Sequence, residues 1–230
     1  MESSNTLYKG ISIQVSLSGY SFKVLTEEGE LRLSGWMGAE SLFTTPEFQH
    51  RYQQVAISLL TPKFCLVPEV FYEPSTARAA LQEVCPLEEG DFVETVPVPS
   101  LASVLVYSNS IGESLSKVMS QTVLPVSGEP VRVLPEMYYL LRQLELLQEY
   151  NKIVASWADG YLHLVIAQGK SLRLANVFQA PDFTTAEYFL FLGLKQLQLN
   201  PEVSTVCFRT PLTSEARMSL YRYFKGVVQL

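Results

Sequence analysis

Side chains that could do chemistry are few in this chain, and they are scattered along it. His163 lies four residues after Asp159, a spacing that allows a loose His–carboxylate pair, but a half-buried structural histidine on a strand with a polar neighbour is the favoured interpretation. The three cysteines, Cys65, Cys85 and Cys207, lack the close pairs that zinc sites use, and neither histidine is placed to activate a thiol. We therefore expect no metal site and three inert thiols.

Composition narrows the possible partners. The net charge is −6 and no basic run occurs, which argues against nucleic acid as the main partner because phosphate contacts need surplus Lys and Arg. No apolar stretch approaches 18 residues, so no membrane span is expected. The first residues lack the features of a signal peptide, and three cysteines suggest reduced thiols. We expect a cytoplasmic protein.

The elements that position these residues occur twice, about 140 residues apart. Ser18-Gly19 and Asp159-Gly160 each separate two alternating apolar runs, which predicts two β-hairpins. The runs are 11–17 and 20–25 in the first copy, and 152–157 and 161–166 in the second. Asp-Gly is a common type I′ turn because both central positions need positive φ, so a purely structural role is favoured for Asp159.

The repeat continues after the hairpins. A second turn at Gly29 or Gly169 precedes a third strand, and Thr-x-x-Glu at Thr44 and Thr184 then predicts two capped helices. The apolar residues at helical spacing are Phe48, Tyr52, Val55, Ala56 and Leu59 in the first helix, and Tyr188, Phe191 and Leu192 in the second. The later matches are a strand at Cys65 and Cys207, a helix at 75–81 and 214–220, and a last strand after Gly90 and Gly226. The common order predicts duplication of one β-β-β-α-β-α-β unit.

The segment between the copies is assigned to the first lobe. Residues 92–98, 101–107 and 122–126 are expected to be strands, and Ile111 to Gln121 a short helix. Pro135 opens a longer helix that runs to Tyr150 and leads directly into the second copy. The predicted domains are 1–150 and a shorter lobe at 151–230.

Two tandem units of this kind resemble the actin-like ATPase superfamily, whose lobes have an RNase H-like α/β fold. The chain looks most like an uncharacterised bacterial family of unknown function built on that fold. In active members ATP binds between the lobes, each lobe offers a hairpin turn to the phosphates, and acidic residues position Mg²⁺. A two-metal RNase H-type nuclease is excluded, because residues 11–17 contain no carboxylate.

Against that pattern the chain departs in three places. The first hairpin has Ser16 or Leu17 where active enzymes carry an Asp, and Tyr20 is expected to crowd the turn. The Gly-Gly motif that holds adenosine is absent, and the sequence ends soon after the last predicted strand. Asp159-Gly160 alone keeps the family pattern, so catalysis is not expected.

Two main hypotheses follow from the resemblance, beside a weaker third in which the same cleft binds another anion or small ligand without turnover. The first is a non-catalytic cytoplasmic interaction or assembly protein, a pseudo-ATPase with no cofactor. The alternative is an ATPase or phosphotransferase with a diverged site, which would bind ATP and Mg²⁺. Its ligands would be Ser18, Gly19, Ser21, Asp159 and Gly160.

Aromatic residues offer a candidate interface for a protein partner or for self-association. They lie in the run 221–224 and at Tyr138-Tyr139. Tyr and Arg are favoured at interaction hot spots, but amphipathic helices of an α/β body explain these residues equally well.

Overall fold

The computed structural model describes residues 8–26, 28–109 and 113–230. The chain forms two compact units that each combine two separate segments. The first unit is Met1–Thr61 with Asn109–Pro135, and the second is Pro62–Ser108 with Glu136–Leu230. No helix in the described residues is both long and apolar enough to cross a membrane.

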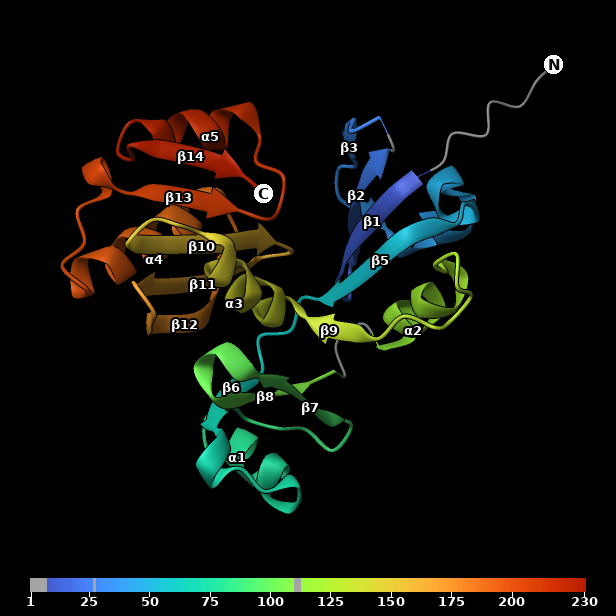
Figure 1. Cartoon of the computed structure of the whole chain (residues 1–230), viewed down its shortest axis with the longest axis horizontal. Helices are drawn as coiled ribbons and strands as arrows, with labels where there is room; N and C mark the ends of the chain where they lie inside the picture. The colour runs from blue at the N-terminus through green and yellow to red at the C-terminus, as the bar shows by residue number, and fades with distance from the viewer. Residues whose placement is uncertain (1–7, 27, 110–112) are drawn as a thin grey trace. The chain divides into compact units, whose positions relative to one another are not determined.

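The first unit is built on one mixed sheet with the strand order β3-β2-β1-β5-β9 (Figure 1). Its strands are β1 (Tyr8–Val15), β2 (Gly19–Thr26), β3 (Leu31–Leu33), β5 (Tyr52–Leu59) and β9 (Val133–Pro135). A two-residue strand, β4 (Met37–Gly38), also pairs with β2. The β1–β5 and β5–β9 pairs are parallel, and the β1–β2 hairpin is antiparallel.

One face of this sheet carries the core of the first unit. The core residues from β1 are Ile11, Ile13 and Val15, whose period of two places them on the same face. They pack with Met119 from α2 (Glu113–Thr122) and with residues of two 3₁₀ helices, η1 (Ala39–Thr44) and η2 (Pro46–Gln49). Ser12 and Gln14 lie on the opposite face of β1, which is the more polar face of the sheet.

The helix predicted from Thr44 through Leu59 is wrong. The structure has η1 and η2 there, followed by strand β5 (Tyr52–Leu59). The spacing of Phe48, Tyr52 and Leu59 fits a helix, but a buried parallel strand can carry a similar apolar run, and pairing with β1 decides the outcome. The strand predicted at 122–126 is also wrong, because only Pro125 forms an isolated bridge. The helix predicted from Ile111 is present as α2, with its first two residues outside the described ones.

The main sheet of the second unit has the order β12-β11-β10-β13-β14, which matches the first sheet strand for strand. Its strands are β10 (Asn151–Ala158), β11 (Tyr161–Gln168), β12 (Ser171–Gln179), β13 (Thr205–Phe208) and β14 (Gly226–Gln229). Helices α4 (Phe183–Gln196) and α5 (Ser214–Tyr221) share a hydrophobic core with odd-numbered residues of β10 and even-numbered residues of β11. Asp182, rather than the predicted Thr184, caps α4 by accepting the Thr185 N–H at 2.7 Å.

The other face of this sheet is covered by α3 (Glu136–Leu146), which contacts β10 and β11. A small antiparallel sheet of order β6-β8-β7 completes the second unit (Figure 1). Its elements are β6 (Phe64–Pro68), η3 (Glu69–Phe71), η4 (Pro74–Thr76), α1 (Ala77–Gln82), β7 (Val93–Val98), η5 (Pro99–Leu101) and β8 (Ser103–Ser108). The residues of this sheet lie between β5 and α2 in the sequence, so they form an insertion between two elements of the first unit.

The insertion changes which segments are equivalent. By topology, β13 corresponds to β5 and β14 corresponds to β9, because each pairs in parallel with its neighbour in the same order. The predicted matches of the Cys65 strand with the Cys207 strand, and of helix 75–81 with helix 214–220, are therefore wrong. The boundary between lobes at residue 150 remains a prediction. The compact units are divided differently, because residues 62–108 and α3 group with the C-terminal strands.

Candidate functional site

The turn between β1 and β2 is closed by its own backbone and bonded to a tryptophan. Ser16 N–H donates to the Gly19 carbonyl at 2.9 Å, which leaves Leu17 and Ser18 at the tip. The Trp36 Nε1–H donates to Ser18 Oγ at 3.1 Å. This bond uses Ser18 Oγ as an acceptor and holds the Trp36 indole at the turn.

Gly19 has a packing role at the same turn. It pairs with Gly38 on β4, and a Cβ built on Gly19 would lie 2.0 Å from the Met37 carbonyl oxygen. Its φ of +156° also lies in a region that other residues rarely adopt. Glycine is required here because the β4 backbone approaches it so closely.

Tyr20 does not crowd the turn, contrary to expectation. Its side chain is fully buried in the core of the first unit, where its ring lies 5.3 Å from that of Phe48. The hydroxyl lies 2.6 Å from Thr45 Oγ1. Burial raises the pKa of the Tyr20 phenol, and the Thr45 hydrogen bond partly opposes that rise.

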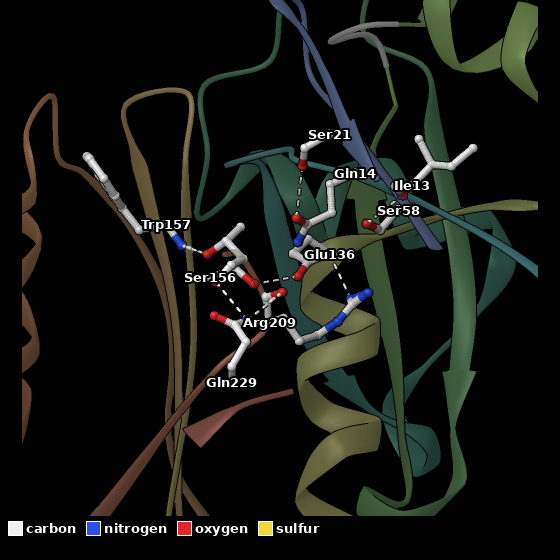
Figure 2. A network of polar contacts seen from close by, with 10 residues as sticks. Ile13, Gln14, Ser21, Ser58, Glu136, Ser156, Trp157, Arg209 and Gln229 are labelled. Atoms are coloured by element: carbon white, nitrogen blue, oxygen red, sulfur yellow. Dashed lines mark hydrogen bonds and ion pairs between the residues drawn. The ribbon is translucent and has the colours of Figure 1, made fainter. Parts of the chain in front are cut away.

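Ser21 lies on the polar face of the same sheet. Register places Ser21, Gln14 and Ser58 in one row across β2, β1 and β5. Ser21 Oγ donates to Gln14 Oε1 at 3.4 Å, and Ser58 Oγ donates to the Ile13 carbonyl at 3.2 Å (Figure 2). The polar row is thus held by bonds within its own sheet.

The second turn has the geometry of a type I′ hairpin. Asp159 has φ +51° and Gly160 has φ +76°, as this turn type requires. The Gly160 carbonyl accepts the Ala180 N–H at 2.7 Å, which ties the turn to the end of β12. Trp157 also packs locally, with its Nε1–H donating to the Ala180 carbonyl at 2.9 Å.

A buried carboxylate lies near the carboxyl ends of β10 and β13. Glu136, the first residue of α3, has no exposed surface. Its Oε1 accepts the Ser156 hydroxyl at 2.5 Å, and its Oε2 accepts Arg209 Nη1 at 2.9 Å (Figure 2). The Arg209 guanidinium also stacks over the Tyr139 ring, 4.7 Å from its centre. Both carboxylate oxygens are therefore engaged by the protein.

Hydrogen bonds to β14 and β10 hold the end of β13 and the loop after it in place. Gln229 Nε2 donates to the carbonyls of Phe208 and Thr210, at 2.9 and 3.0 Å. Thr210 Oγ1 accepts the Trp157 backbone N–H at 2.8 Å. These bonds hold the backbone that carries Arg209 and so help to position the ion pair.

The two sheets carry polar residues at equivalent positions. Ser156 pairs with His163 on β11, and Arg209 follows on the β13 side, since its N–H donates to the Ala155 carbonyl. This row corresponds in topology to the row formed by Ser21, Gln14 and Ser58. His163 is fully buried rather than half-buried as predicted.

Sequence reasoning missed Glu136 and Arg209. The sequence did contain a signal for them, because each of these charged residues is adjacent to a buried apolar segment. Glu136 follows Pro135, and Arg209 follows Phe208. Charged residues in such positions are seldom buried unless they are paired.

The three cysteines are free, and two of them are poorly activated. Burial raises the pKa of both Cys65 and Cys207 from 9.0 to about 11, with smaller effects from Cys85 and Glu149 respectively. Thiols with such raised pKa values are weak nucleophiles and weak metal ligands. In the part of the chain that the structure describes, no three His, Cys, Asp or Glu side chains come together as metal ligands do.

The aromatic residues proposed for an interface divide into two groups. Tyr139 contacts Arg209, and Tyr138 accepts a hydrogen bond from Arg142 at 3.3 Å, so both serve packing within the second unit. Tyr221 and Tyr223 are each about half exposed, whereas Phe224 is buried. The end of α5 is thus the part of this set that faces solvent.

Comparisons with known proteins place the fold. The chain is similar to a protein of Bacteroides thetaiotaomicron with an actin-like ATPase fold and unknown function, with 17% identity and a TM-score of 0.68 over 100% of this chain and 94% of that one. It is also similar to a chain of the PilM–PilN type IV pilus biogenesis complex, with 13% identity and a TM-score of 0.49 over 96% and 88% of the chains. A PPX-GPPA enzyme of Aquifex aeolicus gives 12% identity and a TM-score of 0.36 over 94% and 73%.

The similarity to the Bacteroides thetaiotaomicron protein confirms the predicted α/β class and actin-like ATPase fold. A search of curated proteins gives no match. The model of one family, described as a protein of unknown function (DUF3822), matches residues 38–227, which is most of the chain. The chain therefore belongs to the DUF3822 family.

Proposed function

We propose that this protein is a non-catalytic cytoplasmic interaction or assembly protein that keeps an actin-like ATPase body. One observation carries the proposal. The β1–β2 turn, where active members of the superfamily carry a carboxylate, consists of Ser16, Leu17 and Ser18, and Ser18 is bonded to Trp36. Hydroxyl groups are poor substitutes for the anionic oxygens that Mg²⁺ prefers, so the residues present do not fit a Mg²⁺–nucleotide site.

Glu136 supports the same proposal. Phosphoryl transfer depends on positioned charge, and a carboxylate that holds Mg²⁺ or orients water must be reachable by them. Glu136 has no exposed surface, and its two oxygens accept hydrogen bonds from Ser156 and Arg209. The bonds make this group a structural anchor at the start of α3.

Isothermal titration with ATP, ADP and GTP in the presence of Mg²⁺ tests the proposal. Wild-type protein, shown to be folded by circular dichroism, is expected to give no saturable heat at millimolar nucleotide. Sedimentation velocity over a range of protein concentrations would show in parallel whether the chain self-associates.

The alternative, an ATP-binding enzyme with a diverged site, predicts a different result. Asp159 is the one acidic residue in either turn. Saturable nucleotide binding that is lost in Asp159→Ala, but kept in the exposed control Glu215→Ala, would overturn the non-catalytic proposal. A turnover assay would then be the next step.

A further inference from the structure

The second unit contains a cavity at the end of the β10–β11 hairpin opposite the Asp159–Gly160 turn. It lies among the end of α3, the start of β10, the β11–β12 turn and η5, and its volume is about 350 Å³. Sites for small molecules usually have volumes of a few hundred Å³. This cavity is therefore large enough for a small ligand.

The walls of the cavity are apolar. Leu141 and Leu144 contribute from α3, and Leu101 contributes from η5. The floor is a row across the sheet, because register aligns Lys152 with Ala167 and Ala167 with Leu172. An aliphatic group in this space would be removed from water on several sides, which is favourable in proportion to the area buried.

Two lysines give the cavity a positive charge. Lys152 Nζ donates to the Leu144 carbonyl at 2.7 Å, which fixes its position and offsets the partial negative charge at the end of α3. An ammonium group has three donors, so two remain for a ligand. Lys170 lies at the exposed β11–β12 turn and forms no ion pair with any described residue.

The acidic residue at the cavity does not cancel this charge. Glu145 lies 3.6 Å from Arg142 Nε, so its charge is shared with a third cation. A second cavity, of about 420 Å³ in the first unit, lacks this property because its Arg32 is bound to Glu30 at 3.0 Å. In a chain of net charge −6, the Lys152–Lys170 cavity is a local positive site with apolar walls.

We propose that this cavity binds an amphipathic anion, with a carboxylate or phosphate head at Lys152 and Lys170 and a short aliphatic chain against the leucines. Charge-assisted hydrogen bonds orient the head, and the apolar walls supply most of the affinity. The site is independent of nucleotide binding at the hairpin turns. It would remain if the proposed function were wrong.

Titration calorimetry with octanoate and octyl phosphate tests the proposal and distinguishes the two head groups. Octanol, which has the tail without the charge, and acetate, which has the charge without the tail, should both bind far more weakly. Lys170→Gln should weaken octanoate binding about tenfold at low salt, the effect of one charge-assisted hydrogen bond. Ser100→Trp, at an exposed lining residue, should block the cavity and abolish binding.

Lys195→Gln is the matched control. Lys195 is exposed at the end of α4 and lies outside the cavity, so this variant should bind octanoate as wild-type does. The absence of saturable heat with folded wild-type protein would overturn the proposal. Unchanged octanoate affinity in both Lys170→Gln and Ser100→Trp would overturn it equally, because binding would then occur elsewhere.

Discussion

Glu136 and Arg209 form an ion pair of 2.9 Å although they lie 73 positions apart in the sequence. Glu136 is fully buried and the Arg209 side chain is 11% exposed. Such a pair adds little net stability compared with apolar residues, but removing one partner leaves a buried charge without compensation. The pair therefore fixes how α3 meets the ends of β10 and β13 more than it strengthens the fold.

Arg209→Met should lower the free energy of unfolding of the second unit by about 3 kcal/mol, because the Glu136 charge is left in the interior. The chain has two tryptophans, Trp36 in the first unit and Trp157 in the second. In a Trp36→Phe background, the fluorescence of Trp157 during urea denaturation reports on the second unit alone.

Two further variants control for that change. Glu136→Leu with Arg209→Met removes both charges and should recover most of the loss. Arg142→Met disrupts the exposed Arg142–Glu145 pair and should cost less than about 1 kcal/mol. If Arg209→Met were no more harmful than Arg142→Met, the buried pair would not have the positioning role described.

Gly19→Ala should destabilise the first unit by about 3 kcal/mol, because the new methyl group would overlap the Met37 carbonyl and displace β4. Gly29→Ala is the matched control, since Gly29 has φ +84° but open space around it and should cost only about 1 kcal/mol of backbone strain. Trp36 fluorescence in a Trp157→Phe background measures both. Equal losses would mean that strain, and not contact with β4, explains Gly19.

Local patterns in the sequence were sufficient for the hairpins and for α3 and α4. Each of those elements is specified by a contiguous run: alternating residues around Ser18 or Asp159, or apolar spacing after Pro135. Element β5 was misread because its apolar residues suit a helix as well as a buried strand. Pairing between β1 and β5 distinguishes the two, and no local signal reports it.

The insertion explains the remaining errors. Strand β5 pairs with β9 across residues 60–132, so the equivalence of the two sheets can be seen only once the intervening β6-β8-β7 sheet is recognised as separate. Cys65 and the helix at 75–81 happen to fit the repeat in sequence while they belong to that inserted sheet. The Glu136–Arg209 pair was missed for a different reason, because it depends on contacts between distant segments.

Cys65 and Cys207 should react slowly with iodoacetamide in the native protein. Their pKa values of about 11, against an ordinary 9.0, reduce the thiolate fraction at pH 8 about 100-fold, and limited access slows them further. Site-resolved mass spectrometry of native and urea-unfolded protein measures the rates. Rapid native labelling of Cys207 would contradict the burial that raises its pKa.

The same raised pKa values predict how stability depends on pH. The folded state holds the thiol protons more tightly than the unfolded state, so this contribution to stability is complete below pH 9 and is lost as the pH rises towards 11. Urea denaturation at pH 8 and pH 10 measures the loss. Cys207→Ala should reduce the pH dependence of the unfolding transition that is monitored by Trp157 fluorescence.

Tyr20→Phe should cost about 1 kcal/mol of stability in the first unit. Thr45 Oγ1 donates its proton to the Ser41 carbonyl at 2.8 Å, so in the 2.6 Å contact the Tyr20 hydroxyl must be the donor. Removing that hydroxyl leaves Thr45 with an unused acceptor in the core. Thr45→Val removes the acceptor and also disturbs Ser41, so it should cost more than Tyr20→Phe. A double-mutant cycle, followed by Trp36 fluorescence, isolates the Tyr20–Thr45 bond, and a coupling energy near zero would contradict its assignment.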